Sequence, residues 1–201
     1  MAIWLSLVFF FSGVAALVYQ VVWQRALFAI YGLDVTSVTV VVTAFMLGLG
    51  LGSLAGGALS KIYPKASVPL FGIFEVGIGL FGYFSLHLFD LVAFVTVGIG
   101  HLATGVVAFL LVVFPTTLMG ATLPLLVGYT AKKSGNVGRS VGTLYFVNTL
   151  GAAAGAWLAV SVLLKTFGLS GSAAISAALN VTLGLAVVAA VWLTRRKAAT
   201  Q

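Results

Sequence analysis

The sequence predicts an all-α, polytopic membrane protein with six transmembrane helices, arranged as two inverted three-helix repeats. Three observations lead to this class. Hydrophobic residues make up 62% of the 201 residues and charged residues only 6%, whereas roughly a quarter of a soluble domain is charged. Six apolar runs are long enough for membrane helices, which need about 20 residues each. A glycine pattern in the second run returns in the fifth.

We expect the spans at 3–24, 36–59, 67–88, 95–118, 141–163 and 172–193. The fourth can continue past Pro124, because neighbouring helices re-satisfy the backbone around a membrane proline. The chain 1–201 then forms one domain, with a first repeat at about 1–90 and a second at about 95–194. No soluble catalytic domain fits beside six spans, so we expect no enzyme activity, no catalytic residue and no cofactor.

The basic residues divide unequally between the two sides of these spans. With the N-terminus inside, only Arg25 and Lys165 lie outside; eight lie inside, namely Lys61, Lys65, Lys132, Lys133, Arg139, Arg195, Arg196 and Lys197. The positive-inside rule therefore predicts that both termini are cytoplasmic, in a bacterial or archaeal cytoplasmic membrane. The net charge of +7 then reflects topology, so we expect the lipid bilayer as a partner and no nucleic acid.

Glycines recur every fourth residue in two of the spans. The first stripe consists of Gly48, Gly52 and Gly56. The second lies at a constant offset along the sequence and consists of Gly151, Gly155 and Ala159. Two triplets of helices separated by such an offset enter the membrane from opposite sides, which is an inverted repeat. A stripe without side chains lets another helix approach closely. The stripes pack either inside the bundle or at a seam with a second half, and the sequence leaves both open.

Five segments carry a family resemblance: SGVAALVYQVVWQRAL (12–27), AFMLGLGLGSLAGGALSK (44–61), FEVGIGL (74–80), FPTTLMGATLPLL (114–126) and GTLYFVNTLGAAAGAWLAVSVLL (142–164). Together they resemble the membrane domain of the fused spermidine-synthase-like proteins, which are related to the major facilitators. The most specific parts are Trp23-Gln24-Arg25 and the stretch from Tyr145 to Gly155. The resemblance implies a six-helix half of a major-facilitator transporter.

This chain departs from the family in two ways. In the family an aminopropyltransferase-like domain follows the last span, whereas this sequence stops at Gln201 without that domain's Gly-rich loop and carboxylates. The resemblance thus implies a separately encoded soluble enzyme as a partner. In the loop after the second span, Lys61 stands where the major-facilitator signature has an acidic residue. Ordinary alternating access is therefore in doubt.

Glu75 is the acidic residue inside an apolar run. It lies about 12 Å into the third span at 1.5 Å per residue, where a charged group is costly. We therefore expect an uncharged carboxyl that hydrogen-bonds a neighbouring helix, with Asn148 or Tyr145 as leading partners. It serves either as a proton or cation site or as a structural acid. Asn148 and Tyr145 either contact a substrate or link helices by hydrogen bonds.

Other polar residues within spans have weaker signals. Gln20 and Gln24 form a polar stripe on the first span, which lines a cavity or packs between helices. Thr116, Thr117 and Thr122 are the expected counterparts on the fourth span. Asn180 is expected to form an interhelical hydrogen bond, since amides commonly link membrane helices.

The outer connections offer little chemistry. Arg25 and Asp34 flank the first of them and are expected to form an ion pair. His87, Asp90 and His101 surround another, but their spacing matches no tight metal motif, so we expect no metal site.

Two functions remain open from the sequence. The first is a transporter-like module for a small molecule, which acts as a homodimer or with a partner half. The second is a non-catalytic membrane anchor or accessory subunit of a larger membrane complex or of a separately encoded synthase-like enzyme.

Overall fold

A computed structural model describes residues 3–31, 34–96, 98 and 101–199. Its helices are α1 (Ile3–Tyr31), α2 (Asp34–Ile62), α3 (Ser67–Val95), α4 (His101–Ser134), α5 (Val137–Leu158), the π-helix η1 (Ala159–Leu163) and α6 (Leu164–Ala199). No strand occurs among these residues. The all-helical class predicted from composition is confirmed.

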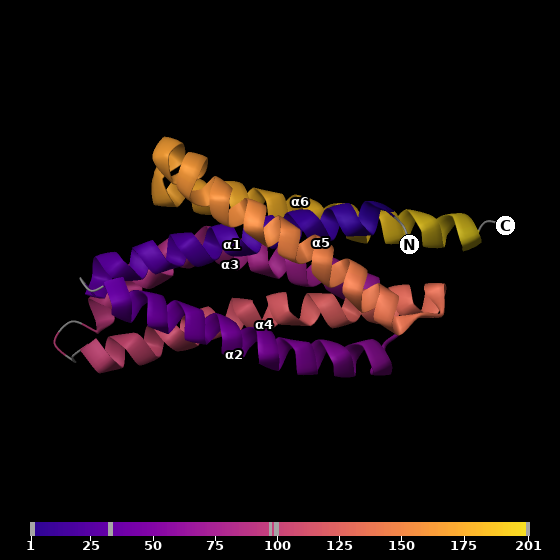
Figure 1. The fold of residues 1–201 in the computed structure, drawn as a ribbon, viewed down its shortest axis with the longest axis horizontal. Coiled ribbons are helices and arrows are strands. Elements are labelled where there is room, and N and C mark those ends of the chain that lie inside the picture. Colours follow the sequence, from indigo (N-terminus) through magenta and orange to yellow (C-terminus); the bar gives the residue numbers. More distant parts are fainter. Residues whose placement is uncertain (1–2, 32–33, 97, 99–100, 200–201) are drawn as a thin grey trace.

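Among the described residues, five helices are long and apolar enough to cross a membrane: Ile3–Ala29, Val38–Ile62, Ser67–Val95, Ala103–Ser134 and Val137–Lys197. This number is consistent with a multi-pass membrane protein. The fifth is 61 residues long, about three times the roughly 20 residues of a single crossing. Within it, Gly168 has a non-helical backbone, with φ 64° and ψ −167°. Figure 1 shows the chain turning back at this point, so that α5 and α6 run in opposite directions.

The fourth helix is longer than the expected span at 95–118, because it continues through two prolines to Ser134. Pro115 lacks an N–H, and the Thr116 and Thr117 hydroxyls donate to the nearby Val112 and Val113 carbonyls at 2.9 and 2.8 Å. Hydroxyls of this kind let membrane helices tolerate proline. The expected continuation past the second proline is confirmed.

Pro124 frees the carbonyl of Gly120 one turn earlier. The Ser53 hydroxyl on α2 donates to that oxygen at 3.4 Å. Helix α4 ends where Gly135 takes φ 68°. Helix α5 begins directly afterwards, because the Asn136 side chain caps it by accepting from the Arg139 N–H at 2.9 Å.

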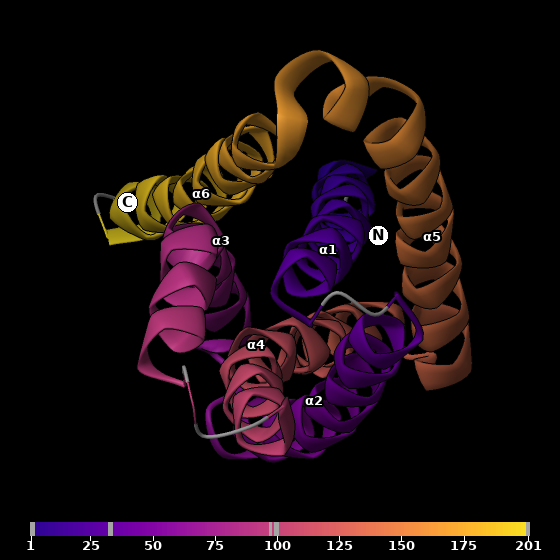
Figure 2. The ribbon, with the colours of Figure 1, turned by 90° about the vertical axis from the view of Figure 1, so that its left-hand side faces the viewer.

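The helices pack in three main pairs, α2 with α4, α1 with α5, and α3 with α6. Figure 2 shows α1 in the middle of the bundle, with α5 and α6 on either side of it. Both termini lie at one end, with the α2–α3 and α4–α5 connections (Figure 1). We call this the terminal end. The eight basic residues assigned to one side by the sequence lie at the terminal end, on the helix ends and connections there.

Aromatic rings fill the core around α1. Trp23 has no exposed surface and stacks on Tyr19 with a centroid distance of 5.2 Å. Phe45, Phe81 and Phe89 surround the indole from α2 and α3. Trp23 is thus a core residue, although its place near a span end also suits a tryptophan at the membrane surface.

Candidate functional site

The candidate site is a buried carboxyl at the meeting of three helices. Glu75 on α3 has no exposed surface. Its Oε1 accepts from the Ser12 hydroxyl on α1 at 2.6 Å, and its Oε2 accepts from the Asn180 amide on α6 at 3.1 Å. The two oxygens therefore tie α3 to α1 and to α6.

The expected partners of Glu75 were wrong. Asn148 instead donates to the Phe9 carbonyl at 3.0 Å, which links α5 to α1. Tyr145 is 61% exposed on α5. The reason is positional, since α5 packs on α1 while α6 packs on α3. The interhelical hydrogen bond expected of Asn180 is present, with Glu75 as its acceptor.

The surroundings of Glu75 favour an uncharged carboxyl. Every Lys and Arg of the chain lies near a helix end or in a connection. Glu75 lies eight residues inside α3, roughly 12 Å along its axis. A buried carboxylate without a cation is strongly disfavoured against its protonated form. A protonated carboxyl adds a donor, and the Asn180 Oδ1, which is buried without a hydrogen-bond partner, offers an acceptor if the amide turns over.

A polar seam continues from this site between α1 and α3. The Tyr19 ring lies over Gly82, where an added Cβ would collide with it. One turn further, the Trp23 Nε1 donates to the Ser85 hydroxyl at 2.9 Å. The Tyr19 hydroxyl is buried and makes no hydrogen bond within the described structure. The seam therefore combines satisfied polar groups with two atoms, the Tyr19 hydroxyl and the Asn180 Oδ1, that lack partners.

The glycine stripes lie inside the bundle. A Cβ added to Gly48, Gly52 or Gly56 on α2 would collide with α4. A Cβ added to Gly151 or Gly155 on α5 would collide with carbonyls of α1. All five are buried. An interface with a second half does not fit these contacts, because the stripes are already covered by helices of the same chain.

Sequence reasoning missed the glycines on the partner helices. Gly120 on α4 faces the Leu49 carbonyl of α2, and Gly13 on α1 faces the Asn148 carbonyl of α5. Each interface thus has glycine on both sides. Neither residue belongs to a run of glycines spaced four residues apart, so no periodic pattern in the sequence marks them. Ser12, directly before Gly13, was also missed as a partner of Glu75.

The remaining candidates do not form one cluster. Gln20 and Gln24 are half-buried on α1 and make no hydrogen bond to the described residues. Thr117 and Thr122 donate within their own helix, to the Val113 and Met119 carbonyls at 2.8 and 2.6 Å. Thr116 also donates to the Ala44 carbonyl of α2 at 3.3 Å. The described residues hold no group of three or more metal-ligating side chains. The side chains of Asp34 and His101 lie outside the described residues, so the expected ion pair does too.

Comparison with protein-family models, curated proteins and solved structures finds no match for this chain. Its function therefore has to be inferred from the residues themselves.

Proposed function

We propose that the chain is a transporter-like membrane module for a small molecule, with six crossings built as two inverted three-helix repeats, and that it works with a second half. The observation that carries this proposal is an exchange relation between helix interfaces. Replacing α1 by α4, α2 by α5 and α3 by α6 converts each main helix pair into another main pair or into itself. An inverted repeat has this property.

Individual contacts obey the same exchange. Gly52 on α2 faces the Thr117 carbonyl on α4, and Gly155 on α5 faces the Val14 carbonyl on α1. The offset in sequence from Gly52 to Gly155 equals the offset from Val14 to Thr117. At this central contact the two interfaces correspond, which supports an inverted repeat.

The α3–α6 pair maps onto itself. Gly72 faces the Gly184 carbonyl, and Gly79 faces the Ala177 carbonyl. The offset from Gly72 to Ala177 equals that from Gly79 to Gly184.

Glu75 and Asn180 are separated by this same offset. This shared offset supports an approximate two-fold axis that passes near the hydrogen-bonded pair. Transporters built from inverted repeats hold their sites near the interface of the two repeats.

The polar stripe on α1 supports the proposal that a second half packs against this chain. Gln20 and Gln24 are half-buried without hydrogen bonds to described residues. Polar side chains at membrane depth need a partner or water. A second copy of the chain, or a partner half, placed against this surface encloses a cavity. That cavity supplies the glutamines with hydrogen-bond partners or with water.

The six crossings are tested by cysteine labelling, which is direct because the chain has no cysteine. Single variants Ser134→Cys, Lys165→Cys and Lys197→Cys are treated in intact cells with an impermeant maleimide. We expect labelling at Lys165→Cys and protection at the other two until the membrane is permeabilised. Labelling of Ser134→Cys and Lys197→Cys from opposite sides would show that Val137–Lys197 crosses once and would refute six crossings.

Transport is tested in proteoliposomes that contain the intact chain and a trapped pH dye. Small amines, organic acids, amino acids and sugars are added in turn. We expect one class to cause proton movement that Glu75→Gln abolishes, while native mass measurement gives a dimer or a complex with a second membrane subunit. A monomer without substrate-dependent proton movement contradicts the proposal.

One observation favours the alternative of an anchor or accessory subunit. Both oxygens of Glu75 are hydrogen-bonded within the bundle, so the carboxyl needs no transported ion to satisfy it. In that case purification of the native complex yields a stoichiometric soluble enzyme or membrane assembly, and Glu75→Gln leaves its activity unchanged.

A further inference from the structure

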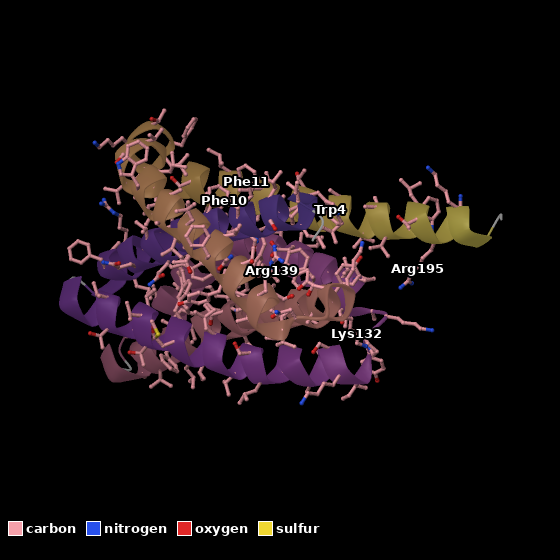
Figure 3. The ribbon with its side chains drawn as sticks, turned by 45° about the vertical axis from the view of Figure 1, so that its right-hand side comes forward. Trp4, Phe10, Phe11, Lys132, Arg139 and Arg195 are labelled. Carbon is pink, nitrogen blue, oxygen red and sulfur yellow. The ribbon has the colours of Figure 1, made fainter. Side chains whose placement is uncertain are left out.

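A pocket of about 930 Å³ opens at the terminal end of the bundle. Its lining comes from five places in the sequence: the first residues of α1, the α2–α3 connection, the start of α3, and the last turns of α4 and α6. Figure 3 shows three of the residues that line it, Trp4, Lys132 and Arg195, at this end of the molecule.

The rim of the pocket is strongly basic. Lys65, Lys132, Lys133 and Arg195 all line it. None of the chain's three acidic residues lies at the terminal end, since Asp34 and Asp90 belong to the opposite end and Glu75 to the core. The four cations therefore have no carboxylate side chain to neutralise them. An anion that enters the pocket therefore meets basic side chains without competition from a carboxylate side chain of the protein.

Part of this rim is held in place by the protein. The Arg195 guanidinium donates to the Lys65 carbonyl at 2.9 Å, which fixes the last turns of α6 against the α2–α3 connection. One guanidinium nitrogen is used in this bond. A guanidinium has five N–H donors, so others remain for a ligand.

The rest of the lining is mostly apolar. Val68 is buried, Trp4 and Tyr129 contribute aromatic rings, and Ala190 and Val191 contribute the face of α6. The pocket thus combines exposed basic side chains with apolar surface. Lys and Arg both bind phosphate oxygens strongly, and basic pockets between membrane helices bind anionic headgroups.

We propose that this pocket binds a phosphate-bearing anion, with the phosphate between the basic side chains of the rim. Two sources share this chemistry, the headgroup of an anionic phospholipid and a soluble phosphate compound. The apolar wall accommodates the glycerol and first methylenes of a lipid. The proposal is independent of transport and of the orientation in the membrane.

The test is native mass spectrometry of the full chain in a neutral detergent, titrated with phosphatidylglycerol and separately with zwitterionic phosphatidylcholine. We expect a retained phosphatidylglycerol and no retained phosphatidylcholine. The double variant Lys132→Gln, Lys133→Gln should weaken retention about tenfold or more, because each basic group near an anionic headgroup contributes to affinity. Equal retention of the two lipids would overturn the proposal.

The matched control removes two charges from the same end but outside the pocket, in the double variant Lys61→Gln, Arg139→Gln. Its affinity should stay within about twofold of the parent at moderate salt, since exposed charges beyond the contact distance are screened. If both double variants weaken retention equally, the lipid responds to general positive charge, and the pocket is not the site.

A pair of uncharged variants tests the pocket without changing the charge. Ala190→Trp fills its wall and should abolish retention, whereas Leu193→Trp, on an exposed part of α6 that does not line the pocket, should not. If Ala190→Trp retains the lipid with unchanged affinity, the proposal fails. Because neither of these two variants changes the charge, the test stays valid even if one of the charge variants misfolds.

Titration of lipid-free protein with inorganic pyrophosphate distinguishes a lipid headgroup from a soluble phosphate compound as the ligand. Binding that depends on Lys132 and Lys133 and that displaces phosphatidylglycerol assigns the pocket to a soluble phosphate compound. Lipid retention that pyrophosphate does not displace assigns it to the membrane lipid. Binding of neither ligand refutes the proposal.

Discussion

The α2–α4 and α1–α5 interfaces differ from the α3–α6 interface in what lies at their centre. In the first two, backbone meets backbone: Gly52 lies against the Thr117 carbonyl and Gly155 against the Val14 carbonyl. In the third, glycines lie on either side of the centre, and a carboxyl and an amide meet between them. One kind of interface depends on the absence of side chains and the other on particular polar groups.

This difference predicts two kinds of sensitivity. Membrane helices gain no hydrophobic free energy by associating, so close packing is a main source of their stability, and packing is closest where backbones approach. Any side chain at such a position separates the helices, whatever its chemistry. At a hydrogen-bonded centre the size of the side chain matters less than whether every donor and acceptor keeps a partner.

The largest effect is expected at the glycine-packed interfaces. Gly52→Leu and Gly155→Leu should each lower the free energy of unfolding by about 3 kcal/mol or more, at the upper limit of overpacking effects, because backbone carbonyls occupy the space. Equal losses are expected from the two variants, since the contacts are counterparts. The measurement is the midpoint of detergent-induced unfolding followed by circular dichroism.

Matched controls lie on the same helices. Gly50 on α2 and Gly142 on α5 face open space, where a Cβ would meet no other atom, so Gly50→Leu and Gly142→Leu should leave the midpoint nearly unchanged. If Gly52→Leu folds as well as Gly50→Leu and only the native mass falls, the stripe serves a contact between copies and not the bundle.

An intermediate effect is expected at the polar centre. Glu75→Ala removes both acceptors and leaves the Ser12 hydroxyl and the Asn180 amide without partners in the core. We expect a loss of roughly 1–3 kcal/mol, since interhelical hydrogen bonds in membranes contribute modestly and an unpaired polar group adds its own cost. The same unfolding midpoint measures it.

A double-mutant cycle with Asn180→Ala sharpens this test. The loss in the double variant should be smaller than the sum of the single losses, because residues that share a hydrogen bond are coupled. Strict additivity would mean that the Glu75–Asn180 bond contributes nothing to stability.

A smaller effect is expected for Glu75→Gln. The amide keeps an oxygen for one donor, and its N–H₂ finds an acceptor in the Ser12 hydroxyl or in the Asn180 Oδ1. The free energy of unfolding should change by less than about 1 kcal/mol. A loss as large as that of Glu75→Ala would show that the negative charge, rather than the hydrogen bonds, holds the three helices together.

Composition alone predicted the class of fold, because scarcity of charge and length of apolar runs are properties of whole segments. The boundaries of α4 were harder to predict from the sequence, because Pro115 and Pro124 normally end a helix. Hydroxyls on α4 and α2 bond to nearby carbonyls and help the helix to tolerate both prolines. The expected spans at 141–163 and 172–193 leave a gap that contains Gly168, and the structure fills this gap with helix on both sides of the turn at that glycine.

The partners of Glu75 were not predictable from the sequence. Which residue meets a carboxyl depends on the register of α1 and α6 against α3, and no local pattern encodes this register. Ser12 is also a common, small residue that belongs to no periodic pattern in the sequence. The sequence therefore indicated that Glu75 needs a partner, while only the packing of the helices identifies Ser12 and Asn180.

The two glycine-packed interfaces also differ from each other, at the third position of each stripe. The third stripe position is Gly56 on α2 but Ala159 on α5, and α5 widens into the π-helix η1 at Ala159. A Cβ on Gly56 would collide with the Ala121 carbonyl, so we infer that the wider turn makes room for the corresponding methyl group. Single π-helical turns are accommodated in this way inside α-helices.

Exchanging the two residue types tests this explanation. Gly56→Ala forces a methyl group against α4 without a π-turn and should cost about 1–3 kcal/mol. Ala159→Gly should stay within about 1 kcal/mol of the parent, because relief of crowding offsets the lower helix propensity of glycine. Both are read from the same unfolding midpoint. If Ala159→Gly is the more damaging variant, the methyl group stabilises the interface, and the π-turn has another cause.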